Sequence, residues 1–132
     1  MKQKISLVIA TLIMILPLAL YAVFKAPKDS AALAAAKDMP VVMEFSSPMC
    51  SECMKLKKTL EIVEPNYEGK IFFKKINAVK MDRETQKLVR KYNVVVVPTT
   101  VFLEKNGNVL ARTEGAISQK TFEYYLDKLL EK

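Results

Sequence analysis

Apolar and polar residues follow one another in this chain in blocks that predict a series of strands and helices from residue 41 onwards. The run 41–45 is apolar except for one glutamate and begins with two valines, which is typical of a buried parallel strand. Further along, Leu56, Leu60 and Val63 recur every three or four residues. This spacing predicts one face of a helix that ends near Pro65.

A second strand and a second helix are expected next. A turn at residues 67–70 contains a glycine, and residues 71–77 are again mostly apolar, so they are expected to form a strand. Asp82 can open a helix that ends by Asn93. A strand, a helix and a strand in succession imply a right-handed parallel crossover.

The last part of the chain predicts an antiparallel hairpin and a closing helix. The valine run 94–97 leads into Pro98, and residues 99–103 continue as a strand. An Asn-Gly turn within 105–108 connects this strand to residues 109–112. Ser118 can cap a final helix with an apolar stripe, made of Phe122, Tyr125, Leu126, Leu129 and Leu130. The predicted class is α/β, with a mixed central sheet and flanking helices.

The N-terminal quarter has a different character and predicts a membrane anchor. Residues 5–24 contain no charge, and about 20 apolar residues suffice for a helix to span a bilayer. We therefore expect an anchor or signal segment at 1–26, a linker with a short helix at 27–38, and one folded domain at 39–132. A cleaved signal peptide is the alternative, although Ala-x-Ala sites occur only well beyond the apolar run.

Basic residues near the apolar run give a weak signal for its orientation. Lys2 and Lys4 precede it, and Lys25 and Lys28 follow it. We expect the domain to lie on the extracytoplasmic side, at the cell surface or in the periplasm, and to be secreted if the segment is cleaved. A domain that faces the cytoplasm is the alternative.

The net charge of +7 does not indicate nucleic-acid binding. From residue 38 onwards, 16 basic residues face 13 acidic ones, and the two kinds alternate, as in the stretch 80–84. A nucleic-acid site needs a clustered basic face. The charged residues are therefore expected to form solvated helix surfaces.

Cys50 and Cys53 are the only cysteines in the 132 residues, so they belong to no larger disulfide framework. Their position between the first strand and the first helix places Cys50 at a helix N-terminus and Cys53 one turn further on the same side. Free N–H groups and the helix dipole favour an anion there, and a thiolate is the reactive form of cysteine. We expect Cys50 to attack and Cys53 to resolve the mixed disulfide.

Metal binding is the alternative use of these sulfurs. A zinc site needs more ligands, and the chain has no histidine and no other cysteine. Met49 and Met54 flank the pair and would suit Cu(I), which makes a copper carrier a second candidate. A binding module whose cysteines do not turn over is a third. No cofactor is expected.

Taken together, these motifs resemble those of the thioredoxin family over residues 40–130. The resemblance is carried by Phe45 with the cysteine pair, by Val97-Pro98-Thr99, and by the stretches 105–107 and 115–118. It implies a thioredoxin fold and an exchange of disulfides with protein substrates. It also implies that Pro98 is cis beside the cysteines, and that Val97, Pro98 and Met49 bind the substrate.

Two charged residues match the proton-handling positions of that family. Glu44 lies six residues before Cys50, within a strand that is expected to be covered on both faces. Burial there would raise its pKa, so that its carboxylate could take the proton of Cys53. The resemblance pairs Lys75 with this acid; a solvated lysine at a strand end is the alternative.

Several departures from the family bear on the direction of the reaction. Met49 stands where a tryptophan is usual, Ser51-Glu52 replaces Gly-Pro, and Lys58 stands where a proline is common. The first strand of the family has no clear counterpart. Because Glu52 is close enough to oppose ionisation of Cys50, we expect a reductase rather than a strong oxidase. Electrons would pass to or from a further redox protein.

Overall fold

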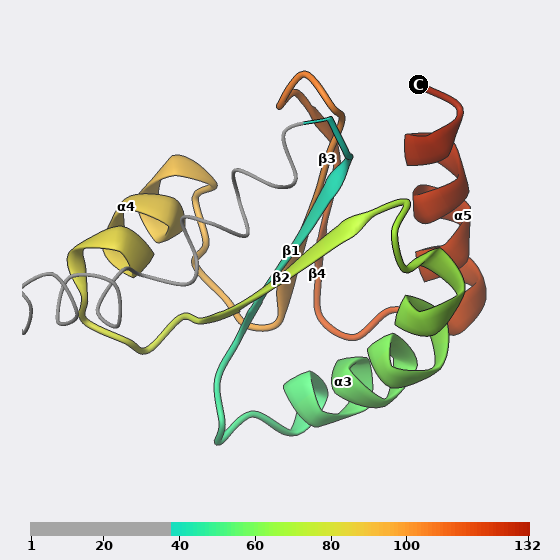
Figure 1. The fold of residues 1–132 in the computed structure, drawn as a ribbon. Coiled ribbons are helices and arrows are strands. Elements are labelled where there is room, and N and C mark those ends of the chain that lie inside the picture. Colours follow the sequence, from blue (N-terminus) through green and yellow to red (C-terminus); the bar gives the residue numbers. More distant parts are fainter. Residues whose placement is uncertain (1–37) are drawn as a thin grey trace, which may run out of the picture. The chain divides into compact units, whose positions relative to one another are not determined.

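The computed structural model describes residues 38–132, in which helices cover both faces of a mixed sheet (Figure 1). The elements in chain order are β1 (Val41–Ser46), α3 (Ser51–Val63), the 3-10 helix η1 (Glu64–Tyr67), β2 (Phe72–Asn77), α4 (Arg83–Lys91), β3 (Thr99–Leu103), β4 (Val109–Glu114) and α5 (Gln119–Leu130). The predicted anchor at 5–24 and most of the linker lie outside the described residues. Within 38–132, no helix combines the length and hydrophobicity that a bilayer crossing requires.

The strands pair in the order β2-β1-β3-β4. β1 runs parallel to β2, with Val41 opposite Phe72, and antiparallel to β3, with Val41 opposite Leu103. β3 and β4 form an antiparallel hairpin around a turn in which Gly107 has a φ of 84°, a conformation that favours glycine. The predicted parallel crossover and hairpin are both confirmed.

Side-chain caps fix where the helices begin. Asp82 accepts a hydrogen bond from the Thr85 N–H at 2.9 Å, and Ser118 accepts one from the Thr121 N–H at 3.2 Å. Each cap satisfies a backbone donor that the first turn would leave free. Both caps are the residues that the sequence predicted.

The sheet separates two apolar clusters, because successive side chains of a strand point to opposite faces. One face of the sheet is covered by α3 and α5 and the other by α4 (Figure 1). The first cluster includes Val42, Leu56, Leu60, Phe102, Phe122, Leu126 and Leu129. The second includes Met43, Phe45, Ile76, Tyr92, Val101 and Leu103.

Two parts of the predicted pattern differ from the structure. Leu130 was expected in the buried stripe, but its side chain, at the last residue of α5, is 38% exposed. The valine run 94–97 does not extend β3, which begins only at Thr99. Instead, this run forms an irregular loop in front of Pro98.

Candidate active site

The two cysteines lie at the junction between the loop that follows β1 and the start of α3. Cys50 is the N-cap of α3, and its Sγ accepts a hydrogen bond from the Cys53 N–H at 3.1 Å. The two residues form a disulfide, with their Cα atoms 5.1 Å apart. Cys50 is partly exposed, whereas Cys53 is only 4% exposed. An incoming reagent therefore meets Cys50 before Cys53.

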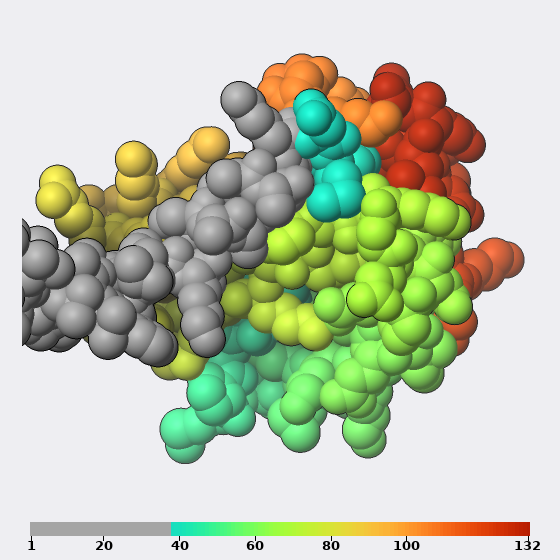
Figure 2. All heavy atoms as spheres, viewed as in Figure 1, coloured from blue at the N-terminus to red at the C-terminus, as the bar shows by residue number. Residues whose placement is uncertain are grey.

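The loop between β1 and α3 projects from the surface of the domain (Figure 2). This loop starts after Ser46, and its backbone turns through a hydrogen bond from the Cys50 N–H to the Ser47 carbonyl at 3.3 Å. Pro48 and Met49, at the tip of the loop, are both exposed. A large substrate such as a folded protein can thus approach Cys50 from solvent.

A second segment, distant in sequence, completes the site. The Val97–Pro98 peptide bond is cis, as expected, and the carbonyl oxygen of Val97 lies 3.6 Å from Cys50 Sγ. The Thr99 hydroxyl donates to the Val96 carbonyl at 2.7 Å, and the Gly115 N–H donates to the Pro98 carbonyl at 2.8 Å. These bonds hold the backbone of the loop beside the reactive sulfur.

An apolar surface surrounds this contact. Met49 is 97% exposed and Val95 is 73% exposed, and Val79 and Val96 are also exposed. A groove of about 190 Å³ runs along the valine loop and is lined only by apolar residues, namely Ala78, Val79, Val89 and Val94 to Val97. Val79 was missed by the sequence analysis, because nothing in its local pattern connects it to the valine run.

Glu44 lies inside the domain, behind the cysteine pair. Its side chain is 6% exposed and lines a cavity of about 390 Å³ that also reaches Cys53, Lys57 and Lys75. Burial raises the pKa of Glu44, while the nearby Ser46 hydroxyl and the Lys75 ammonium lower it to a smaller extent. Glu44 is therefore buried, and it lines the same cavity as Cys53.

Two threonines extend the row of Glu44 across the sheet. Thr100 of β3 lies directly opposite Glu44, and Thr113 of β4 lies opposite Thr100. Among residues 38–132, the buried Thr100 and Thr113 hydroxyls find no hydrogen-bond partner. The carboxylate thus gains no support from these hydroxyls, which is consistent with the raised pKa of Glu44. The sequence did not reveal this row, because it depends on strand register.

Lys75 lies opposite Glu44 in the pairing of β2 with β1. Its ammonium, however, forms an ion pair with Glu64 at 2.6 Å, and its side chain is 51% exposed. Lys75 therefore faces Glu44 across the strands, where its charge lowers the pKa of Glu44, and it is also ion-paired with Glu64. Glu64, the first residue of η1, was not identified from the sequence.

Glu52 lies between the cysteines in sequence, and its carboxylate pairs with Lys55 at 2.6 Å. This contact lowers the pKa of Glu52, so the group is charged at neutral pH. The ammonium of Lys55 offsets part of the negative charge near Cys50 that the sequence predicted.

Within 38–132, no group of three or more histidine, cysteine or acidic side chains is arranged to hold an ion.

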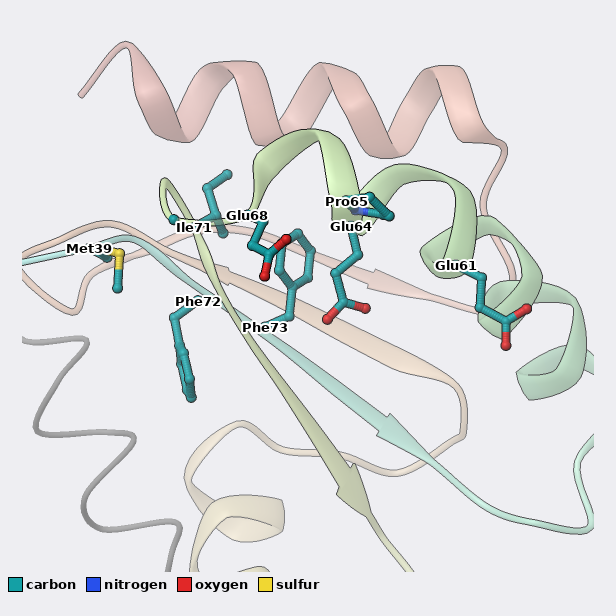
Figure 3. A pocket seen from close by; sticks show the side chains of 9 residues that line it. Met39, Glu61, Glu64, Pro65, Glu68, Ile71, Phe72 and Phe73 are labelled. Atoms are coloured by element: carbon teal, nitrogen blue, oxygen red, sulfur yellow. The ribbon is translucent and has the colours of Figure 1, made fainter.

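A larger cavity, of about 460 Å³, lies beside β2 and contains no cysteine (Figure 3). Its lining is formed mainly by Phe72 and Phe73 with Glu61, Glu64 and Glu68.

Comparison with known proteins agrees with this arrangement. A family model described as a thioredoxin-like domain matches residues 27–130. A thioredoxin from Pseudomonas aeruginosa is 33% identical over 90 residues, which cover 68% of this chain and 79% of that protein. Thioredoxin 1 from Nostoc sp. is 28% identical over 93 residues, which cover 70% of this chain and 82% of that protein.

A solved structure shares the fold. The germline-specific thioredoxin Deadhead from Drosophila melanogaster matches with a TM-score of 0.65 and 28% sequence identity. The match covers 76% of this chain and 90% of that chain.

Proposed function

This chain belongs to the thioredoxin family and carries the cysteine pair of a thiol–disulfide oxidoreductase, and we propose that it reduces disulfides of protein substrates from a membrane anchor. One observation carries the proposal. The partly exposed Cys50 caps α3, touches the Val97 carbonyl, and is bonded to the buried Cys53. The accessible sulfur of Cys50 thus lies between the Val97 backbone, which can align a substrate, and the sulfur of Cys53, which can release it.

In the reduced enzyme, the Cys50 thiolate attacks one sulfur of the substrate disulfide, and the other substrate sulfur leaves as a thiolate. The Cys53 thiol then gives its proton to Glu44 through water in the cavity, and its thiolate attacks Cys50. The second substrate thiolate leaves, and the Cys50–Cys53 disulfide forms. The two electrons pass from the cysteine pair to the substrate, whose two thiolates then take up protons, one released by Glu44 and one from the solvent.

The surface around Cys50 favours a polypeptide substrate. The Val97 carbonyl borders the loop before β3, where an extended chain can add backbone hydrogen bonds. The exposed side chains of Met49, Val79 and Val95 offer apolar contacts beside it. We therefore propose that Met49, Val97 and Pro98 bind the polypeptide that flanks the substrate disulfide.

The reductive direction is proposed from the local charges. Glu52 retains a carboxylate between the cysteines, although Lys55 pairs with it. A negative charge near Cys50 disfavours its thiolate, and a stable thiolate is what makes a strong oxidant. The equilibrium of the Cys50–Cys53 pair with glutathione measures this preference. A strongly oxidising potential would reverse the proposed direction.

The membrane anchor is proposed from residues 5–24, whose uncharged length suits a bilayer. The two lysines that precede them favour an extracytoplasmic domain that receives electrons from another redox protein. Expression of the full chain in cells, followed by carbonate extraction and labelling with a membrane-impermeant thiol reagent, tests this. Release by carbonate, or labelling only after lysis, would contradict it.

Insulin reduction by the full chain with dithiothreitol tests the reaction itself. Cys50→Ser should abolish the activity, because the remaining sulfur is buried. Cys53→Ser should instead accumulate a mixed disulfide between Cys50 and insulin, visible on a non-reducing gel. Equal loss in both variants without a mixed disulfide would refute the assigned order. Stoichiometric Cu(I) uptake without reduction of insulin would favour the carrier.

A further inference from the structure

The cavity that joins Glu44 to Cys53 has two lysines among its lining residues. These are Lys57 from α3 and Lys75 from β2. The cavity, of about 390 Å³, can hold water that connects the carboxyl group to the sulfur. A proton that passed between Glu44 and Cys53 in this cavity would therefore move beside two lysine residues.

Each of these lysines has its own glutamate. Lys75 pairs with Glu64 at 2.6 Å, and Glu64 is only 33% exposed. Lys57 pairs with Glu61 at 3.9 Å, and both of these side chains are more than half exposed. Figure 3 shows the Glu64 side chain extending from the start of η1 towards β2, with Glu61 nearly one turn earlier on α3. The Lys75 pair is thus the closer and the better shielded of the two.

Lys75 would be a natural partner for Glu44 if Glu64 were not there. The two residues face each other in the register of β1 and β2, and cross-strand neighbours have Cβ atoms about 5 Å apart. A full ion pair with Lys75 would favour the charged form of Glu44 and make it a poor proton acceptor. A second carboxylate on the same ammonium weakens that attraction.

We propose that Glu64 is a positioning residue for the redox reaction. Its ion pair with Lys75 prevents that ammonium from forming a full ion pair with Glu44. Glu44 therefore remains able to exchange a proton with Cys53. This inference rests on the proposed function for its chemistry. It adds a residue, on η1, that neither the sequence pattern nor the cysteine motif indicates. Glu64 touches no reacting atom and acts only through Lys75.

The charges around Glu44 agree with this role. Burial is the largest cause of the raised pKa of Glu44, Lys75 acts against it, and Glu64 adds to it. The charged groups that face the cavity are Lys57 on α3, Lys75 on β2 and, through Lys75, Glu64 on η1. Neutralising Glu64 therefore leaves Lys75 unopposed and lowers the pKa of Glu44.

The test compares Glu64→Gln with Glu61→Gln in the full-length chain. The ionisation of Glu44 is followed by carbon NMR of labelled glutamate, with Glu44→Gln to assign the signal. Glu64→Gln should move the Glu44 midpoint to lower pH, whereas Glu61→Gln should leave it in place. Resolution of a mixed disulfide, measured by stopped flow near neutral pH, should slow roughly threefold to tenfold in Glu64→Gln alone.

Two further variants separate positioning from a structural effect. In the Lys75→Met background, Glu64→Gln should shift the Glu44 midpoint much less, because the effect passes through the lysine. Glu64→Asp retains the charge and should restore part of the wild-type pH profile. It also serves as the test if Glu64→Gln is unstable.

The outcomes distinguish this inference from the proposed function. If wild type reduces insulin and Glu64→Gln has the same Glu44 midpoint and pH profile as Glu61→Gln, the positioning role is refuted and the function stands. The positioning role is also refuted if Glu64→Gln shifts the Glu44 midpoint equally in the wild-type and Lys75→Met backgrounds. If wild type does not reduce insulin, the function fails, while the NMR titration still decides whether Glu64 controls Glu44.

Discussion

Met49 offers a direct test of how the substrate binds, because its side chain is 97% exposed in the free protein. Full burial of a methionine side chain contributes about 1.5–3 kcal/mol. If a bound polypeptide covers about half of it, Met49→Ala removes roughly 0.75–1.5 kcal/mol of binding, which corresponds to about a fourfold to tenfold rise in KM. The change should leave kcat nearly unaltered, since Met49 does not contact Glu44 or the resolving sulfur.

The same exposure predicts almost no effect on folding. A surface side chain without native contacts changes stability by less than about 0.5 kcal/mol when truncated. Steady-state reduction of a protein disulfide at several substrate concentrations gives KM and kcat, and urea unfolding gives the stability. Ile62→Ala is a matched control, because Ile62 is 57% exposed but lies near the other end of α3.

The reasoning would be refuted by an unchanged KM in Met49→Ala, or by an equal rise in Ile62→Ala. A substrate with a short peptide around its disulfide should show a smaller effect than a protein substrate. The reason is that a short peptide covers less of the apolar surface around Cys50.

Two further predictions concern folding. Burial raises the pKa of Glu44 in the folded chain above its ordinary value of 4.5, so the folded state holds a proton that the unfolded state has lost. Stability should therefore fall as pH rises from about 4.5 through the raised value, and Glu44→Gln should lack this fall when urea midpoints are compared across pH. The same dependence of stability on pH in the wild type and in Glu44→Gln would contradict this prediction. Phe102 is fully buried against Phe122 and Tyr125, with ring centroids 5.3 and 4.9 Å away, so Phe102→Ala should lose about 3–5 kcal/mol in denaturant unfolding. A loss below about 1 kcal/mol would contradict the assigned core.

Local features of the sequence were sufficient to predict the main helices and strands and the place of the two cysteines between β1 and α3. The cap residues Asp82 and Ser118 act within one turn, so their role can be inferred from neighbouring residues. The positions of Cys50 and Glu44 could be predicted in the same way, because they depend only on a strand, a short loop and the start of a helix that are consecutive in the sequence. The exposed Leu130 shows the limit of this approach, since an apolar period does not tell where a helix ends.

Residues that depend on packing between elements could not be predicted. Glu64 meets Lys75 only because η1 lies over β2, and the two are 11 positions apart. The hydroxyls of Thr100 and Thr113, which find no hydrogen-bond partner within residues 38–132, join the row of Glu44 through strand register alone. Distances of this kind follow from the assembled sheet, whereas helical and strand periods describe each element by itself.

The contact between Cys50 and the Val97 carbonyl joins residues 47 positions apart. A fragment that ended before β3 would keep both thiols and lack the peptide-aligning backbone beside them. Catalysis of thiol–disulfide exchange with a protein substrate is therefore expected to depend on the assembly of the sheet that includes β3. During gradual denaturation, this catalysis should be lost together with the β3–β4 hairpin. The thiols themselves should still react with small alkylating agents at that stage.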